Sequence, residues 1–410
     1  MSPSPAGQPA MQRAKVFTYA TGMLNDSQTE LIGFIIPLYA VVLGLSPLEL
    51  GVLVAAKSFL PSILSIHGGV LMDRYGTRLV MLVMGVACTL MPPLFIVASW
   101  FPALLLLQMA LGTVLSFGWI GAQALAVRVG RDDPKVVGRF SFFARVGVMI
   151  APTMAGAMWD FLPYWVSFLV TAGMGVAFWL AVRGIPAAAL GEERSADAPR
   201  PPFRLRDILP SLSDYIGAIG LMVIPVVAFV VVVSSVRIGS ALMQQSFYII
   251  YLKELGLQAT IIGLFITLSQ LMAAAGTLSA AWFTRFIHPH WMFLGMVTAS
   301  VILIYATPLF GSAFIVLALA IALRGFAQGA SQPVMYTILS DAVSRETQAT
   351  SIGLRATGNR VAGISLPIIM GGVAQVWGLN ATFFVSGGLL LAILAGSGIA
   401  IARIHGKNKA

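Results

Sequence analysis

Seven ionisable side chains interrupt long apolar segments of the sequence, where a charge is costly. A charge at the centre of a membrane helix costs about 2.5–3.5 kcal/mol on insertion scales, so each charge needs a partner or a watery cavity. Two of the seven are acids and five are bases, so pairing among them cannot neutralise all of the bases. Such groups bind a charged solute, move a proton or hold helices together. They are Asp26, Glu30, Lys57, Arg145, Arg237, Arg324 and Arg360.

The composition identifies the environment in which these charges act. Of the 410 residues, 58% are hydrophobic and 10% are charged, which is too few charges to cover a water-soluble surface. Apolar runs of about 20 residues recur, and they predict membrane helices rather than the alternating strands of a barrel. The single Cys88 excludes an internal disulfide or a thiolate metal cluster. We therefore predict an all-α polytopic membrane protein. The sequence has no His/Cys/Asp cluster with metal-ligand spacing, no GxSxG motif and no phosphate-binding loop, and its soluble segments are too short for a domain, so we expect no enzymatic activity, metal or other cofactor.

Twelve apolar segments are long enough to cross a membrane, and they fall into two groups of six. The first group lies at 17–42, 50–72, 79–99, 103–127, 139–160 and 164–183, and the second at 219–250, 260–283, 291–311, 313–340, 351–374 and 380–403. The predicted domains are a tail at 1–16, a six-helix bundle at 17–183, a linker at 184–216, a second bundle at 217–403 and a tail at 404–410. Residues 203–215 fit either an interfacial helix or a plain linker.

Positive charge is distributed unevenly among the connections, and this orients the chain. Of the 25 Lys and Arg residues, five lie inside the predicted helices and 19 lie in the tails, the linker and alternate connections or at the helix ends beside them, with Lys253 as the exception. The positive-inside rule then places both termini in the cytoplasm. The net charge of +10 thus reflects membrane orientation, and we expect no nucleic-acid partner.

Polar side chains recur at helical spacing along four of the segments, so that each segment has one polar face. Asp26 and Glu30 are one turn apart in the first segment, and their carboxylates point the same way. We interpret one of these two as a proton carrier. The polar residues of the fourth, seventh and tenth segments are interpreted as solute-binding, and they are Gln108, Trp119, Arg237, Gln244, Arg324, Gln328 and Gln332.

Each of these charges also has a structural interpretation. An arginine can bond the backbone carbonyls of a neighbouring helix and hold the bundle together. We favour this role for Arg145 and Arg360, which lie beside proline and glycine, whereas Lys57 fits either role. Asp26 and Glu30 could also be salt-bridge partners of Lys57 or Arg237.

The two halves of the sequence look like copies of one another. LGLSPLELG from Leu43 corresponds to LGLQATIIG from Leu255, and Arg145 with Pro152 corresponds to Arg360 with Pro367 at nearly the same offset. The shared order and offset predict a duplication. Duplicated halves around a central loop are typical of transporters that alternate access to a site at mid-membrane.

The connection GGVLMDRYGTR, from Gly68 to Arg78, carries the charges between the second and third segments. It resembles the signature loop of the major facilitator superfamily of secondary transporters, with Thr77 in place of one expected base. The resemblance implies 12 transmembrane helices in two pseudo-symmetric six-helix bundles, a cavity lined by helices 1, 4, 7 and 10, and a monomer. It assigns gating or structural roles to the residues that match, which are Gly69, Asp73, Arg74, Gly76 and Arg78.

A second resemblance concerns direction. RVGVMIAPTMAG, from Arg145 to Gly156, is similar to the helix 5 motif of drug and metabolite antiporters in that superfamily, with Gly147 and Pro152 also matching. Small residues and a proline allow close packing that closes a leak. Those exporters usually carry an arginine in helix 4 at the position of Gln108, so Arg324 is the candidate to replace part of its proton-relay role.

Together these features predict a proton-coupled exporter of a small organic solute in the cytoplasmic (inner) membrane. The excess of bases favours an anionic or zwitterionic solute. Two alternatives stay open: an importer of an organic acid by proton symport, and a multidrug exporter of lipophilic cations. The expected energy source is a proton gradient, and the expected partners are the small-molecule solute and membrane lipid.

Overall fold

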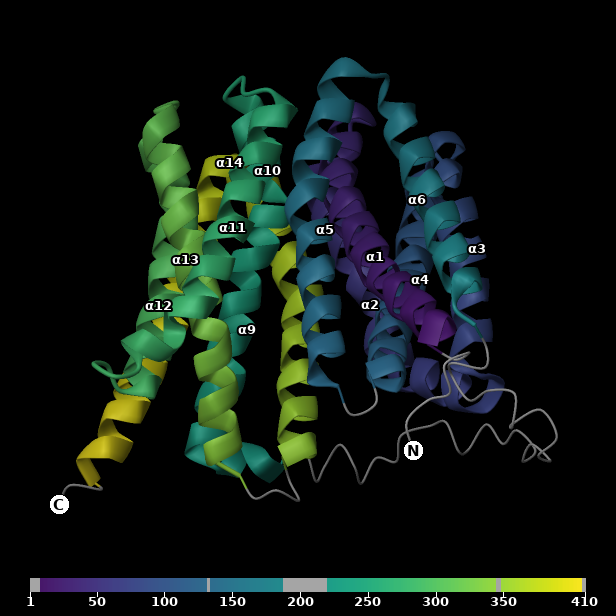
Figure 1. Cartoon of the computed structure of the whole chain (residues 1–410). Helices are drawn as coiled ribbons and strands as arrows, with labels where there is room; N and C mark the ends of the chain where they lie inside the picture. Colours follow the sequence, from purple (N-terminus) through teal and green to yellow (C-terminus); the bar gives the residue numbers. More distant parts are fainter. Residues whose placement is uncertain (1–7, 131–132, 187–219, 344–347, 408–410) are drawn as a thin grey trace. The chain divides into compact units, whose positions relative to one another are not determined.

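The computed structural model describes residues 8–130, 133–186, 220–343 and 348–407 (Figure 1). All of the regular structure in this described part of the chain is helical, which confirms the predicted fold class. The helices belong to two compact units, the first made of Met1–Tyr39 with Ala56–Leu209 and the second of Ala40–Ala55 with Pro210–Ala410. The predicted linker at 184–216 lies outside the described residues from residue 187 onward, and so does its segment 203–215.

The first unit contains the helices of the first predicted group. They are α1 (Gln8–Val42), α2 (Pro47–Tyr75), α3 (Thr77–Val97), α4 (Phe101–Gly130), α5 (Pro134–Phe161) and α6 (Tyr164–Gly184). The end of α1 and the start of α2, residues 40–55, pack with the second unit instead. The predicted domain boundaries treat this hairpin as part of the first bundle, and those boundaries stay a prediction.

The second unit contains the remaining helices. They are α9 (Pro225–Gln245), α10 (Phe247–Glu254), α11 (Ala259–Phe283), α12 (Pro289–Tyr305), α13 (Phe314–Asp341) and α14 (Gln348–Lys407), together with the short turns η4 (Leu221–Val223) and η5 (Thr307–Phe310). Nine helical stretches in the described part of the chain are long and apolar enough to cross a membrane. The polar residues of α1 lower its mean hydropathy, α12 is shorter, and one stretch joins two predicted segments.

Three of the predicted segments differ from the helices in the structure. The segment at 219–250 is broken at Ser246, whose φ of −135° and ψ of −92° separate α9 from α10. The segments at 351–374 and 380–403 both lie in α14, where Gly378 with φ 83° and ψ 169° interrupts the helix. Glycine adopts this positive φ without steric penalty. The turn between the eleventh and twelfth predicted segments is therefore a single kink rather than a loop.

Helices approach closely where one of them carries a glycine. In the second unit, Gly329 of α13 faces the backbone of Ala273 on α11, and Gly325 faces the backbone of Ser269 one turn earlier. The Thr277 hydroxyl donates to the Gly329 carbonyl at 3.1 Å across the same contact. Without a hydrophobic driving force inside lipid, such close packing and interhelical hydrogen bonds supply much of the association between membrane helices.

Buried polar side chains also hold α1 in the first unit. The Gln28 amide donates to the carbonyl of Cys88 on α3 at 2.9 Å and to that of Thr171 on α6 at 3.0 Å. The Tyr39 hydroxyl donates to the Phe95 carbonyl at 2.8 Å. Because Gln28 is 1% exposed, these bonds fix the rotation of α1 about its own axis. The face of α1 that carries the carboxylates is therefore set by the structure of the unit.

We expect replacement of Gly329 by valine to destabilise the second unit. A Cβ at this position would overlap the backbone of Ala273, which cannot move aside as a side chain could. Overpacking of this kind costs about 1–3 kcal/mol. Thermal unfolding of the detergent-purified protein checks the prediction, with Gly295→Val as the matched control because no atom lies within 4 Å of a Cβ there. Equal unfolding temperatures for the two variants would contradict it.

Candidate functional site

Four charged side chains gather in the first unit on three helices. Asp26 and Glu30 lie on α1, Lys57 on α2 and Arg145 on α5, and both bases interact electrostatically with both carboxylates. The carboxylates and Lys57 are half-buried, whereas Arg145 is exposed. Two acids and two bases sum to zero charge, so the group is neutral when all four are ionised. Partners of opposite charge are the means by which a membrane protein tolerates such residues.

Lys57 is placed by the packing of α2. Its ammonium donates to the Thr29 carbonyl on α1 at 3.3 Å, between the two carboxylate positions. The backbone of Lys57 touches α4 at Gly112, where a Cβ would overlap the Lys57 carbonyl oxygen. The glycine thus lets α2 approach α4, and the lysine side chain leaves α2 on the side that faces α1.

The helix 5 motif packs against α1 in the same unit. At Gly147 a Cβ would overlap the Met23 carbonyl and the Ser27 hydroxyl of α1. Gly147, Pro152 and Gly156 are all buried. Arg145 lies two residues before Gly147, so this contact helps to hold its guanidinium beside the α1 carboxylates. These small residues pack within the unit, while the gating role predicted for them stays a prediction.

The predicted solute-binding residues of α4 are largely enclosed. Gln108 is 2% exposed, and its amide oxygen is a buried acceptor that has no partner within the described residues. Trp119 is stacked on Phe140 of α5 with ring centroids 5.8 Å apart. Gln108 is one turn from Gly112, where α4 meets α2. An acceptor in this position suits a donor on a solute, while Trp119 is occupied in packing.

Arg324 forms the central polar contact of the second unit. It is 1% exposed on α13. Its Nη2 donates to the Ser240 carbonyl at 3.1 Å, its Nε donates to the Ser240 hydroxyl at 3.4 Å, and its Nη1 donates to the Ser269 hydroxyl at 3.4 Å and to the Gln244 amide oxygen. These bonds join α13 to α9 and α11. They occupy most of the five donors of the guanidinium, so Arg324 supports the unit internally, and its predicted solute contact stays a prediction.

The other polar residues predicted in this unit are more accessible. Arg237 is half-buried on α9, three residues before Ser240, and its charge acts on Arg324. Gln328 and Gln332 are half-buried on α13, and the Gln328 amide oxygen is a buried acceptor that lacks a partner in the described structure. The second unit therefore groups Arg237 with amide side chains along α9 and α13.

One cluster in the second unit was not predicted from the sequence. Arg355 near the start of α14 is 9% exposed and lies against Tyr336 of α13, with its guanidinium carbon 5.1 Å from the ring centroid. Asn359 follows one helical turn later. In the sequence, Arg355 lies near the start of the predicted segment at 351–374, and it was not among the seven charges assigned to the apolar segments. The spacing of Arg355 and Asn359 at i and i+4 was the available signal. Arg360, which was predicted, is half-buried on a neighbouring face of α14.

Most of the signature sequence lies within α2 and α3, and only Gly76 separates the two helices. Its φ of 89° turns the chain. Arg128 at the end of α4 pairs with Asp73 at 3.7 Å, and Arg78 donates to the Arg183 carbonyl of α6 at 3.1 Å. Arg74 lies over the ring of Tyr75, and around Gly69 there is open space. The matching residues thus join the ends of four helices, while their gating role stays a prediction.

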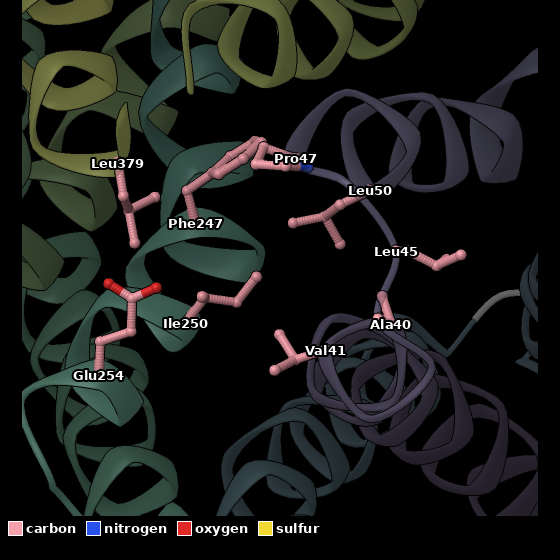
Figure 2. A pocket seen from close by; sticks show the side chains of 10 residues that line it. Ala40, Val41, Leu45, Pro47, Leu50, Phe247, Ile250, Glu254 and Leu379 are labelled. Carbon is pink, nitrogen blue, oxygen red and sulfur yellow. The ribbon is translucent and has the colours of Figure 1, made fainter. Parts of the chain in front are cut away.

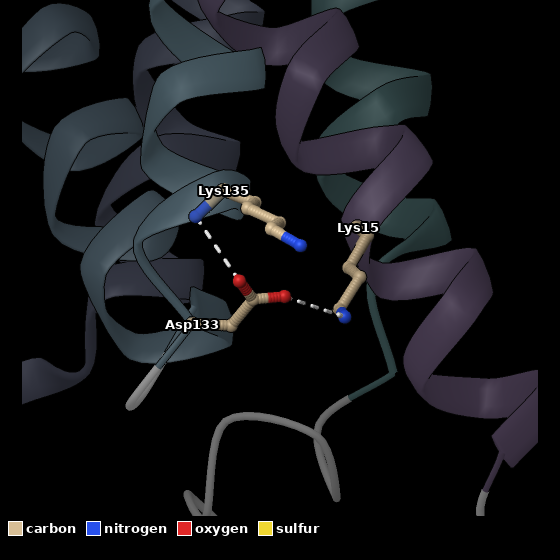
Figure 3. A network of polar contacts seen from close by, with 3 residues as sticks. All are labelled: Lys15, Asp133 and Lys135. Atoms are coloured by element: carbon tan, nitrogen blue, oxygen red, sulfur yellow. Dashed lines mark hydrogen bonds and ion pairs between the residues drawn. The ribbon is translucent and has the colours of Figure 1, made fainter.

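Asp133 lies at the N-terminal end of α5 and contacts both that helix and α1. Asp133 caps the helix, because its carboxylate accepts from the Lys135 backbone N–H at 3.0 Å. Its other oxygen pairs with Lys15 of α1 at 3.9 Å (Figure 3). A carboxylate at a helix N-terminus satisfies free N–H groups and the helix dipole, and here it also ties α1 to α5.

A pocket of about 240 Å³ lies in the second unit and is mostly apolar. Figure 2 shows Ile250 of α10 facing the side chains of Val41 and Leu50 across the pocket, while the Glu254 carboxylate is turned toward Leu379. Its volume is below the range of about 300–1,000 Å³ that is typical of small-molecule sites. The pocket is distinct from the charged groups described above, and we assign no solute to it.

The fold and the buried charges together define a multi-pass membrane protein of the secondary-transporter class. The sequence profile of the Major Facilitator Superfamily matches residues 18–252 and 233–405. The chain therefore belongs to the major facilitator superfamily, as its signature loop predicted. This is a family of transporters, not of enzymes, and its members move small-molecule solutes within a lipid environment. A comparison with curated protein sequences gave no significant match.

Several solved transporter structures have a similar fold. A variant of the nucleoside transporter NupG has a TM-score of 0.77 and 13% identity, covering 95% of this chain and 99% of that chain. A bacterial homologue of the human lysosomal transporter Spinster, inward-facing and occupied, has a TM-score of 0.72 and 14% identity, covering 98% of each chain. A bacterial homologue of the iron transporter ferroportin, inward-facing, has a TM-score of 0.68 and 16% identity, covering 95% of this chain and 98% of that chain.

We expect Arg324→Gln to lower the thermal stability of the protein. Each buried acceptor left without its donor costs about 1–3 kcal/mol, and Arg324 serves acceptors on two other helices. Gln332→Ala on the same helix is the control, since that side chain is half-buried and its loss leaves the bonds of Arg324 in place. Unfolding temperatures in detergent check this. A stable Arg324→Gln variant that fails only in transport would instead support solute contact.

Proposed function

We propose that this protein is a proton-coupled exporter of a small anionic or zwitterionic organic solute. It acts as a monomer in the cytoplasmic membrane, with both termini in the cytoplasm and the proton gradient as its energy source. The orientation is supported by the distribution of lysine and arginine among the connections. The observation that carries the coupling is the neutral group of Asp26, Glu30, Lys57 and Arg145 in the first unit.

Proton coupling follows from the charge balance of this group. When Asp26 or Glu30 binds a proton, the group gains one positive charge in a region where charge is costly. The proton and the positively charged group of a zwitterionic solute compete for the same carboxylates, so a proton that enters displaces the solute. Such competition is what an exporter driven by proton exchange needs. A purely anionic solute would instead bind more tightly to the protonated group, which is the linkage of the alternative, import by proton symport.

The charges of the second unit support the proposed solute class. Its buried or half-buried bases include Arg237, Arg324 and Arg355. The acids among its described residues, Glu49, Glu254 and Asp341, lie at helix ends. The second unit therefore has a surplus of positive charge along its helices, which favours an anionic group on the solute. Arg237 is our candidate for direct solute contact because it is more accessible than Arg324.

The direction of transport rests on the helix 5 motif. Its resemblance to the antiporter branch and the buried packing of Gly147, Pro152 and Gly156 support export. Import of an organic acid by proton symport would use the same bases. Export of lipophilic cations would require the solute to bind Asp26 and Glu30 directly. The experiments below separate these alternatives.

Neutralising the two carboxylates singly tests the coupling. We expect one of Asp26→Asn and Glu30→Gln to exchange solute between equal concentrations while losing accumulation driven by a pH gradient. The remaining carboxylate still balances one base, so the variant folds and binds. Both activities are measured with purified protein in liposomes, and Asp341→Asn at the exposed end of α13 is the control. If both variants remain driven by the gradient, the proton is carried elsewhere.

The charge of the solute is tested by proton movement in liposomes that contain a pH-sensitive dye. We expect organic anions or zwitterions to give a signal and lipophilic cations to give none, because the second unit has surplus positive charge. Arg237→Gln should reduce the signal by about tenfold or more, which is the loss of one charge-assisted hydrogen bond. A signal from lipophilic cations alone would identify a multidrug exporter and would make the arginines structural.

A further inference from the structure

Arg355 in the second unit is a buried base with unused hydrogen-bonding capacity. Its Nε is enclosed and has no hydrogen-bond partner in the described part of the chain. Its Nη2 reaches the Tyr336 hydroxyl at 3.5 Å, which is at the outer limit for a hydrogen bond. The contrast with Arg324 is clear, because that guanidinium donates to a serine carbonyl, two hydroxyls and an amide.

Asn359 holds the guanidinium of Arg355 without neutralising it. With its amide oxygen turned toward Arg355, Asn359 accepts from Nη1 at 3.1 Å. Its amide nitrogen then donates to the carbonyl and hydroxyl of Ser234 on α9, at 3.3 and 3.2 Å. This orientation satisfies both partners, so the hydrogen-bond network assigns it. Arg355 is thus oriented by a neutral side chain that is itself fixed to α9.

The charge of Arg355 has no counter-ion among the described residues. Within the described structure its side chain contacts Tyr336 and Asn359, and neither of these carries a negative charge. A buried charge without a partner is costly, and a guanidinium with free donors matches the two oxygens of a carboxylate. We propose that Arg355 and Tyr336 form an anion subsite that binds the carboxylate of the transported solute.

Polar side chains lie beside Tyr336 on the same face of α13 and can bind the rest of the solute. Tyr336 is 42% exposed, so the aromatic side of the subsite is accessible. Gln328, Gln332 and Tyr336 are spaced four residues apart on α13 and form one stripe of that helix. The buried amide oxygen of Gln328 is still without a donor. A carboxylate at Arg355 therefore leaves the rest of the solute beside amides that can bond its polar groups.

This inference rests on the proposed function, since it assumes an organic anion as the solute. Its test measures binding to detergent-purified protein by calorimetry, with benzoate, succinate and glutamate as probes and benzamide as the neutral match for benzoate. We expect at least one of the anions to bind the wild-type protein and benzamide to bind weakly.

Arg355→Gln should weaken anion binding by roughly 10–100-fold, as expected for a lost charge-assisted pair, and should abolish the preference for benzoate over benzamide. Arg355→Lys keeps the charge but not the planar guanidinium, so its affinity for the anion should lie between those of the wild-type protein and Arg355→Gln. Tyr336→Phe should cost a few-fold. Arg285→Gln, on an exposed turn after α11, is the control. Size-exclusion chromatography verifies that each variant is folded.

Three outcomes would overturn the subsite, and only the second of them also overturns the proposed function. If anions bind the wild-type protein and Arg355→Gln binds them equally well, the subsite is wrong and the proposed function stands. If no anion binds the wild-type protein while lipophilic cations do, the proposed function fails and the subsite fails with it. Should Arg355→Gln not fold, unchanged anion affinity in both Arg355→Lys and Tyr336→Phe overturns the subsite.

Discussion

The close approach of α2 to α4 at Gly112 is the contact on which the charged group of the first unit depends. Because no Cβ intervenes, the backbone of α2 at Lys57 lies directly against α4. The lysine then extends to the Thr29 carbonyl, between Asp26 and Glu30. A larger residue at position 112 would displace the base from its acids. Backbone packing therefore comes first, and the electrostatic arrangement follows from it.

The two units carry different kinds of charge chemistry. In the first unit, acids and bases occur in equal number within one group, so a single proton changes its net charge. In the second unit the bases predominate, and neutral oxygens of Ser240 and Gln244 hold Arg324. Neutral hydrogen-bond acceptors stabilise the charged form of a buried arginine but leave its positive charge unpaired. A proton site and an anion site can in this way be kept in separate parts of one chain.

Hydrophobic runs and helical spacing were sufficient to predict the number and order of the helices, because both depend on local composition. Spacing also predicted that Asp26 and Glu30 share one face of their helix, whereas the approach of Lys57 to them depends on packing between α1 and α2. The sequence could not reveal that Arg324 is enclosed, since that depends on serines from two other helices. Nor could it separate Arg355 from the interfacial bases, because burial at the start of α14 depends on contact with Tyr336. The breaks at Ser246 and Gly378 likewise have no signature in hydropathy.

The break at Ser246 also affects how the second unit can deform. The Ser246 hydroxyl donates to the Leu242 carbonyl at 2.6 Å. This bond satisfies one of the carbonyl groups that lose their backbone donor where the helix is interrupted. Since the ladder of backbone hydrogen bonds is already open there, bending at this point costs less than bending an intact helix. The short α10 can tilt while α9 stays bonded to Arg324. The pair α9 and α10 thus combines a rigid segment with a hinged one.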